Sequence, residues 1–498
     1  MKNPSVKLNV LANFAGKGWI SIIQILFIPL YIRWLGIESY ALIGVFASLV
    51  AILSILDMGL GATINRELAR YSAHQDTAQE SRDLVRTLEF IYWGMGIVIG
   101  VSIMGMAPLL ARYWIQSDRI PAEVIEQSFM IMGLILAVQW PTSLYSGGLM
   151  GLQQQVLLNW VRAFLATLQS GGAVLLLWLV SPSILVFFYW QAATALLGTL
   201  VLAFSLWRFL PQSGHKPTFS QSLLRKNWRF AAGITGISIV AIILTQSDKI
   251  ILSKMLTLQA FGYYTLAVNI SSALGVITGS FSLAIFPRFS QLVAIHNLSE
   301  LSDLYHKVCQ SVSILIFPAA FTLAVFSQEI LTFWIRDTQV AQNTHQLLSV
   351  IAIGTALNAI MTPPYTLQLA HGWTRLSFLK NVVAIVILIP ALFWATMHFG
   401  AMGAAAIWVI LNAGYFFIEI PIMHNVILHQ EKWRWYFQDI GIPFLVSVGI
   451  LLSIRSFIPR DGTLTTLLLI GLSGLLSLSI TAISRPFVRK SLKQSLHI

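Results

Sequence analysis

Charged residues are scarce in this sequence. They make up 10% of its 498 residues, against about 25% in a typical soluble domain, whereas hydrophobic residues make up 56%. These proportions exclude a water-soluble fold. The short alternating segments of a membrane β-barrel are also missing, while apolar runs recur along the chain. Because a segment inside lipid must satisfy its own backbone hydrogen bonds, such runs predict transmembrane α-helices of about 20 residues each.

Cysteine is nearly absent. The single cysteine, Cys309, lies inside an apolar run, which excludes a disulfide framework and a cysteine-based metal site. The sequence contains no P-loop, no HExxH or GxSxG motif and no aspartate-rich loop, so we predict no metal, no cofactor and no enzymatic activity. A membrane glycosyltransferase or polymerase remains the non-transport alternative. It commonly carries a large external loop, and the external loops expected here are short.

Apolar runs separated by short polar stretches predict an all-α integral membrane protein with about fourteen spans, or about twelve as the alternative. The run near the N-terminus is long and lacks a small-residue cleavage pattern, so we interpret it as a retained first span rather than a signal peptide. The expected helices cover 10–32, 41–64, 87–112, 122–148, 155–180, 183–207, 229–252, 259–286, 305–334, 346–369, 376–397, 402–427, 437–457 and 463–484.

Most of the 31 basic residues fall in alternate loops, which sets the predicted orientation. Because cytoplasmic loops concentrate Lys and Arg, this distribution predicts a bacterial inner-membrane protein with both termini in the cytoplasm. Contact with anionic lipid headgroups explains the net charge of +12 and requires no nucleic-acid partner. The basic residues assigned to the cytoplasmic side are Lys2, Lys7, Arg66, Arg70, Arg82, Arg86, Arg208, Lys216, Arg225, Lys226, Arg229, Arg288, Lys307, Arg375, Lys380, Lys432, Arg434, Arg485, Arg489, Lys490 and Lys493.

An internal repeat is indicated by three pairs of identical residues that share one spacing. Each pair occupies the same place relative to its expected helix, as in transporters built from two related bundles. We therefore expect an N-terminal six-helix lobe over 1–210, a C-terminal six-helix lobe over 225–427 and two additional helices over 437–486. The pairs are Arg66 with Arg288, Pro141 with Pro363, and Asn159 with Asn381.

Two cations are expected inside spans, Lys17 and Arg162. Ionisable residues inside a membrane usually face a bundle interior or a wet cavity, so both are candidates for capturing an anionic headgroup. A guanidinium can bind phosphate through two nitrogens, whereas an ammonium acts as a point charge. The alternative for both is an internal ion pair with Asp57 or Glu419. Polar residues that share their helix faces are Asn13, Ser21 and Gln24 with Lys17, and Asn159 and Gln169 with Arg162.

Three acids are candidates for coupling transport to protons or sodium: Asp57, Glu419 and Asp248. Desolvation among helices favours the protonated carboxyl, which suits a coupling site, and structural pairing is the alternative for each. The expected helix over 346–369 adds cavity candidates Asn358 and Tyr365. Prolines interrupt that helix and suit either a bending element or a fixed kink.

Five short motifs resemble the polysaccharide-export branch of the multidrug/oligosaccharidyl-lipid/polysaccharide (MOP) exporter superfamily, the Wzx-type O-antigen flippases. The similarity runs over most of the chain and is strongest in the first 70 residues and over 230–290. The motifs are LGIESYA at 35–41, DMGLG at 57–61, GLQ at 151–153, DKIIL at 248–252 and FGYY at 261–264.

This resemblance implies two six-helix lobes around a V-shaped cavity with a cationic lumen, which fits Lys17 and Arg162. It implies a substrate of undecaprenyl pyrophosphate bearing an oligosaccharide, ion-coupled alternating access, surrounding membrane lipids, and a glycan polymerase and chain-length regulator as partners. Lipid II flippases and cation-coupled multidrug antiporters of the same superfamily are the alternatives. Multidrug exporters typically place an acid in the first helix, where this sequence has Lys17.

Overall fold

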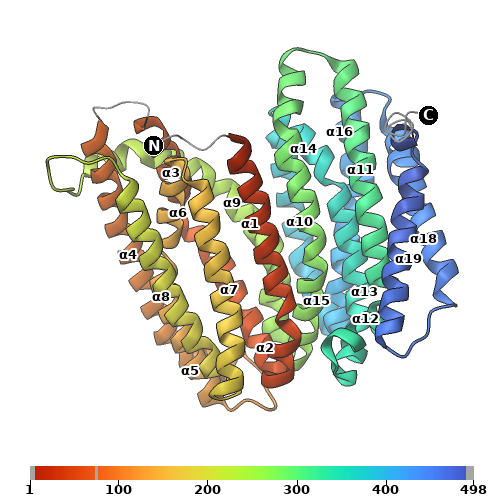
Figure 1. The fold of residues 1–498 in the computed structure, drawn as a ribbon, viewed down its shortest axis with the longest axis horizontal. Helices are drawn as coiled ribbons and strands as arrows, with labels where there is room; N and C mark the ends of the chain where they lie inside the picture. The colour runs from red at the N-terminus through yellow and green to blue at the C-terminus, as the bar shows by residue number, and fades with distance from the viewer. Residues whose placement is uncertain (1–5, 73–76, 490–498) are drawn as a thin grey trace. The chain divides into compact units, whose positions relative to one another are not determined.

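The computed structural model describes residues 6–72 and 77–489, and every regular element in these ranges is helical (Figure 1). Eleven helical segments in the described ranges are long and apolar enough to cross a membrane. The prediction of an all-α integral membrane fold is therefore confirmed, while the count of fourteen spans stays a prediction. The chain divides into two compact units, unit 1 over Met1–Gln259 and unit 2 over Ala260–Ile498. The lobe boundaries expected from the sequence stay predictions.

The helices of unit 1 are built around glycines that let backbones approach closely, the usual device of membrane helix packing. On α3 and α6, a Cβ at Gly147 would lie 2.4 Å from the Gly61 carbonyl oxygen. On α4 and α5, a Cβ at Gly133 would lie 2.8 Å from the carbonyl oxygen of Gly100. The helices are α1 Val6–Leu26, α2 Ile28–Leu53, α3 Leu60–Tyr71, α4 Ala78–Leu109, α5 Ala122–Gln139, α6 Thr142–Gly151, α7 Gln155–Leu179, α8 Ile184–Phe209 and α9 Gln221–Met255, with short helices η1 Ser54–Asp57 and η3 Leu110–Trp114.

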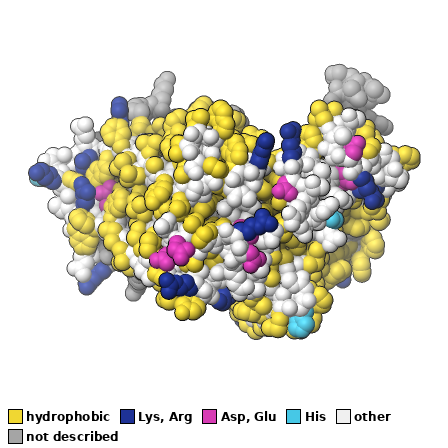
Figure 2. Space-filling model, turned by 90° about the horizontal axis from the view of Figure 1, so that it is seen from below, with side chains coloured by type: hydrophobic (Ala, Val, Ile, Leu, Met, Phe, Trp, Pro, Cys, Tyr) yellow, Lys and Arg dark blue, Asp and Glu magenta, His cyan; other side chains and the backbone are white. Residues whose placement is uncertain are grey.

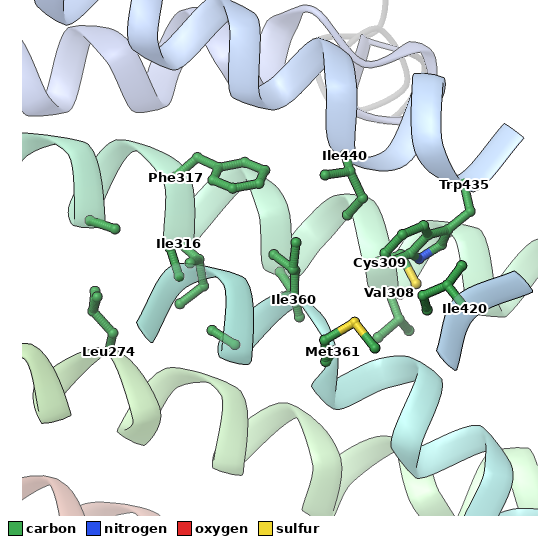
Figure 3. Close-up of a cluster of buried hydrophobic side chains, with 14 of the residues drawn as sticks. Leu274, Val308, Cys309, Ile316, Phe317, Ile360, Met361, Ile420, Trp435 and Ile440 are labelled. Atoms are coloured by element: carbon green, nitrogen blue, oxygen red, sulfur yellow. The ribbon is translucent and has the colours of Figure 1, made fainter. Parts of the chain in front are cut away.

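Unit 2 packs around α11, whose buried side chains form one apolar core with neighbouring helices (Figure 3). Cys309 lies in this core beside Val308 and Trp435 and is buried. The helices are α10 Leu258–Ala294, α11 Leu298–Val325, α12 Ser327–Ile335, α13 Thr338–Ile360, α14 Thr362–Ala370, α15 Thr374–Gly414, α16 Ile420–Val426, α17 Lys432–Arg434, α18 Ile442–Arg455 and α19 Leu464–Ile483, with the π-helical turns η4 Tyr415–Glu419 and η5 Trp435–Gly441.

Five helices that the sequence predicts as continuous are broken within the described residues, and those expected over 10–32 and 305–334 are interrupted at Phe27 and Phe326. The helix expected over 41–64 is interrupted after Asp57, where Met58 and Gly59 both have positive φ. The helices expected over 122–148 and 346–369 each divide into two, α5 with α6 and α13 with α14. These two breaks fall at Pro141 and just before Pro363, because proline lacks the amide hydrogen that would continue the helix. The related prolines therefore mark the same break in both units.

One pair of expected helices is joined instead of separate. The helices predicted over 376–397 and 402–427 follow each other without a loop, and the chain bends at Gly400, which has a φ of 57°. A positive φ is accessible to glycine at little cost, so the bend needs no intervening residues. A similar bend occurs inside α2 at Gly36, with a φ of 79°.

The surface is that expected of a protein in lipid. Large apolar side chains are exposed along many helices, among them Trp178 (68% exposed), Phe204 (67%) and Phe417 (67%). Figure 2 shows apolar side chains spread over the visible face with charged ones scattered among them. In water such apolar exposure would be unfavourable, whereas in lipid it carries no such cost.

Basic residues gather at one end of each unit. In unit 1, the α3–α4 end meets the segment after α8, where Arg82 donates to the Pro211 carbonyl oxygen at 3.3 Å and Asp83 accepts from the Thr218 amide at 2.6 Å. In unit 2, the start of α11 lies beside Arg434 and the chain after α19. Each unit thus has one distinctly basic end, and this is the end that we predict to be cytoplasmic.

Candidate functional site

The first predicted site residues lie on the seam between α1 and α7, which run side by side (Figure 1). Gly16 permits this contact, because a Cβ there would lie 2.9 Å from Asn159 Oδ1. Asn13 Nδ2 donates to Gln155 Oε1 at 2.8 Å, and Asn159 Nδ2 donates to Asn13 Oδ1 at 2.5 Å. The amides of Asn13 and Asn159 therefore bond to each other across the seam, as polar groups do between membrane helices.

A groove of about 400 Å³ follows one side of this seam. Trp19 and Trp160 stand on it and are largely exposed, and Trp19 Nε1 donates to Thr167 Oγ1 at 2.9 Å. The lining residues that the structure describes are mostly apolar, and none of them is charged. This side of the α1–α7 pair therefore suits contact with lipid rather than with an anion. The lining residues are Ala15, Gly16, Trp19, Asn159, Trp160 and Ala163.

Lys17 and Arg162 lie on the other side of the seam. Residues advance by about 100° around a helix, which places Lys17 and Gln24 on the side of α1 opposite Trp19, and Arg162 on the side of α7 opposite Trp160. Lys17 and Gln24 are exposed and Arg162 is half-buried. Neither cation has a hydrogen bond or ion pair through its side chain within the part of the chain that the structure describes. The two cations thus share one face, here termed the cationic face.

Asp57 occupies the break between α2 and α3. It ends η1, and its carboxylate accepts from the Tyr92 hydroxyl at 2.5 Å and from the Gly61 amide at 3.3 Å. No cation pairs with it among the described residues. Its carboxylate therefore links the broken helix to α4 through neutral donors. A carboxylate at a helix break inside a span is the arrangement in which transporters bind coupling ions.

Asp248 is placed differently. Its carboxylate lies 3.6 Å from Lys249 Nζ near the end of α9, and the same ammonium donates to the Thr245 carbonyl oxygen at 3.0 Å. Both side chains are about a quarter exposed. The pairing of neighbouring opposite charges favours the structural interpretation of Asp248.

In unit 2, Glu419 forms an ion pair that the sequence analysis missed. Lys380 was assigned to the cytoplasmic side, but it lies on α15 with its ammonium 2.5 Å from Glu419 Oε2. Gln368 Nε2 donates to the other carboxylate oxygen at 2.8 Å, and Ser377 Oγ donates to Gln368 Oε1 at 3.1 Å. Glu419 is 3% exposed. The expected partners of Glu419, Lys17 and Arg162, both lie in unit 1, and the carboxylate is already satisfied within unit 2.

Aromatic rings complete this cluster. Lys380 Nζ lies 4.7 Å from the Tyr415 ring centre and 5.8 Å from that of Tyr365, within the range of cation–π attraction. Asn358 lies apart from the cluster, where its Nδ2 donates to Asn412 Oδ1 at 2.8 Å. Of the two cavity candidates on this helix pair, Tyr365 therefore contacts the charged cluster and Asn358 joins α13 to α15.

A second apolar groove, of about 410 Å³, includes this ion pair in its lining. It runs along α15 on both sides of its bend and continues to Ile422, with Lys380, Tyr415 and Glu419 as its polar residues. The position of Lys380, six residues past the start of α15, is the signal that could have placed it inside a span. Its partner lies 39 residues further along the chain, and no local pattern indicates the pairing.

Long apolar helices and broken spans, together with two cations that have no partner among the described residues, are typical of a multi-spanning α-helical membrane transporter. Two solved structures share this fold. Lipid II flippase MurJ in an inward closed conformation has a TM-score of 0.71 at 15% identity, covering 96% of this chain and 99% of that one. An inward-facing MATE family transporter of the MOP superfamily has a TM-score of 0.66 at 14% identity, covering 82% and 96%.

The model of the polysaccharide biosynthesis protein family matches residues 6–293, and the chain belongs to this family. It is similar to a putative O-antigen transporter of Shigella flexneri, at 21% identity over 425 residues that cover 82% of this chain and 96% of the relative. It is also similar to the lipopolysaccharide biosynthesis protein WzxC of Escherichia coli K12, at 25% identity over 272 residues, covering 53% and 54%. The resemblance to the Wzx-type branch of the MOP superfamily is thereby confirmed.

Proposed function

We propose that this protein is a flippase that carries an oligosaccharide repeat unit linked to undecaprenyl pyrophosphate from the cytoplasmic to the periplasmic leaflet. The observation that supports it most directly is the cationic face, where Lys17 and Arg162, both expected inside spans, have no acidic partner among the described residues. The family and the names of the similar proteins support a role in polysaccharide export.

The chemistry of a diphosphate fits this face. A cation inside a span is unfavourable unless it meets an anion or water, so an anionic ligand that enters the face gains an attraction that no described neighbouring side chain supplies. The Arg162 guanidinium suits two oxygens of one phosphate, and the Lys17 ammonium suits the second phosphate as a point charge. Gln24 on the same face offers an amide for neutral hydroxyl groups of the sugar.

The coupling acid in this proposal is Asp57. Of the three acids expected inside spans, Glu419 is held by Lys380 and Asp248 lies beside Lys249, whereas Asp57 is bonded only by neutral donors in the described structure. A proton or sodium ion that binds Asp57 changes the charge at a helix break, which is where a span can bend. Glu419 and Asp248 act in this proposal as structural ion pairs.

We also propose that the chain lies in a bacterial inner membrane with both termini in the cytoplasm, among anionic lipids. The basic end of each unit supports this orientation. A glycan polymerase and a chain-length regulator are the proposed downstream partners, because a flipped repeat unit must be joined to others on the far side. The proposed partners are consistent with the names of the similar proteins, an O-antigen transporter and a lipopolysaccharide biosynthesis protein.

The test is reconstitution in liposomes with a fluorescent undecaprenyl-pyrophosphate oligosaccharide. Its movement between leaflets is measured with and without an imposed proton or sodium gradient, beside protein-free liposomes and liposomes holding an unrelated membrane protein. We expect protein-dependent movement that the gradient accelerates. Folded protein that leaves the lipid in place, yet exports cationic drugs, would support a multidrug antiporter and contradict the flippase.

A further inference from the structure

Unit 2 contains a charged pocket that the proposed transport route does not use. It has a volume of about 450 Å³ and lies at the basic end of the unit, between the first turns of α11, the π-helical η5 and the chain that follows α19. Among the residues that the structure describes, four cations line it, Lys307, Arg434, Arg485 and Arg489, against one lining acid, Asp303.

The cations of this pocket differ in whether a nearby acid balances their charge. Arg434 lies 3.6 Å from Glu431 and 3.9 Å from Asp303, so two acids balance it. Lys307 is exposed and has no acidic partner within the described ranges. Arg489 is also exposed, and its guanidinium bonds only the Ser484 carbonyl oxygen, at 3.3 Å. Two exposed cations, Lys307 on α11 and Arg489 after α19, therefore remain available to an anion.

Arg485 adds a fixed cation at the base of the pocket. The residue is 3% exposed, and its guanidinium donates through Nη1 to the Gln438 carbonyl oxygen and through Nε to Ser484 Oγ at 3.3 Å. Its third nitrogen, Nη2, has no bond to any residue that the structure describes. Because it is anchored by two bonds, this guanidinium presents its free edge with little loss of conformational entropy on binding.

Nearby acids are held by other donors. Asp439 accepts from His306 and, at 2.7 Å, from Gln310 Nε2, and it is fully buried behind the pocket. Glu431 lies 3.1 Å from the other nitrogen of His306 and accepts from Ser302 at 2.9 Å. These bonds hold α11 against η5 and keep both carboxylates directed at His306 rather than at Lys307 and Arg489.

Apolar groups continue the pocket toward the lipid. Ile442 and Phe487 are part of its lining, and Ile442 begins α18. On the same helix, Phe444 and Leu445 are exposed, as expected of a side that meets acyl chains. A ligand that fits both the cationic and the apolar part of the pocket has an anionic head and an apolar tail. A free phosphate ion would contact only the cationic part.

We propose that this pocket binds the headgroup of an anionic glycerophospholipid, with its phosphate between Lys307, Arg485 and Arg489 and its acyl chains along the exposed side of α18. Basic pockets between helices at the cytoplasmic surface are suited to such headgroups. The bound lipid would connect Lys307 at the start of α11 with the chain after α19. Among the described residues, no bond from the Lys307 side chain makes this connection.

The test measures lipid binding rather than flipping, so it is independent of the proposed function. The full chain in detergent is titrated with phosphatidylglycerol or phosphatidylcholine, and bound lipid is counted by native mass spectrometry. The double variant Lys307→Gln with Arg489→Gln removes the two exposed cations without disturbing buried groups. The matched control is Lys432→Gln, at the same end of the unit but outside the pocket lining, where Lys432 stacks on Trp433 at 4.9 Å.

We expect wild type and Lys432→Gln to prefer phosphatidylglycerol, and the double variant to lose this preference by about tenfold or more, because each cation near the surface contributes to headgroup binding. Phosphatidylcholine binding should be equal in all three. Unchanged phosphatidylglycerol binding in the double variant would overturn the proposal. So would displacement by an equal concentration of inorganic phosphate, which would make this a free-phosphate site, or by a polyisoprenyl phosphate, which would assign the pocket to the carried lipid.

Discussion

At the scale of single residues, charge pairing separates the candidates that the sequence treats alike. Lys17, Arg162, Asp57 and Glu419 are all ionisable residues in predicted spans. The structure gives Glu419 a partner in Lys380 and leaves Lys17 and Arg162 without one among the described residues. An ion pair lowers the free-energy cost of burying a charge, whereas an unpaired cation keeps this cost until an anion binds it. The unpaired cations are therefore the stronger candidates for ligand binding.

The first prediction concerns Arg162. We expect Arg162→Ala to slow translocation of the lipid-linked oligosaccharide by about tenfold or more, because a charge-assisted hydrogen bond contributes about 1.5–3 kcal/mol. Arg162→Lys should retain part of the rate, since it keeps the charge and loses the planar fork. The liposome assay measures both. Arg112→Ala is the matched control, because Arg112 is an exposed arginine at the end of a span in the same unit. Wild-type flux in Arg162→Ala would remove this residue from the site.

The second prediction concerns the Lys380–Glu419 pair as a structural element. Glu419→Gln leaves the Lys380 ammonium, 18% exposed, beside a neutral amide, and we expect a clear loss of thermal stability in detergent. The double variant Glu419→Gln with Lys380→Met should recover most of that loss, because it removes the orphaned charge. A double variant no more stable than the single one would show that the pair is not the source of the effect. A double variant that is stable yet no longer responds to an ion gradient would return Glu419 to the coupling candidates.

At the scale of elements, apolar runs predict where the helices lie, and particular residues decide where they break. The composition of 155–180 and 183–207 predicts α7 and α8 to within a few residues. Pro141 and Pro363 are visible in the sequence, but a proline inside a span is compatible with a kink or a full break, and only packing decides between them. The break after Asp57 has no proline. It depends on Met58 and Gly59 adopting positive φ, which no local pattern requires.

Residues that come together across elements were the least predictable. Asn13 and Asn159 are expected to line a cavity; the structure brings their amides together at the α1–α7 seam, and the cavity stays a prediction. The pair of Lys380 with Glu419, and that of His306 with Asp439, join residues far apart in sequence. Helical spacing orders residues on one helix only, so it carries no information about which helix lies opposite.

The third prediction tests glycine-mediated packing between α3 and α6. Gly147→Ala places a methyl group 2.4 Å from the Gly61 carbonyl oxygen, which is backbone and cannot rotate away. We expect a loss of about 1–3 kcal/mol in stability, typical of overpacking, seen as a lower unfolding temperature in detergent. The control is Gly94→Ala in α4, where an added Cβ meets nothing within 4 Å. Equal effects of the two substitutions would contradict the close approach.

At the scale of the whole molecule, fold and orientation rest on different physical terms. Apolar runs and backbone hydrogen bonding determine that the chain forms spans, and this part is predictable from composition alone. Orientation depends on where Lys and Arg lie relative to the span ends, so a shift of one span would reverse it. Each unit has one basic end, and we expect each of these ends to face the cytoplasm. The orientation can therefore be tested in either unit.

The last prediction uses the single cysteine. Cys309 is buried in the core of unit 2, so Cys309→Ser gives a background in which one added thiol reports its own side of the membrane. His215→Cys lies in the exposed segment after α8, at the basic end of unit 1, and Ser456→Cys lies exposed at the opposite end of unit 2, after α18. In intact cells a membrane-impermeant maleimide should label Ser456→Cys and spare His215→Cys. In inverted vesicles the labelling should exchange, and the reverse pattern would place the basic ends outside.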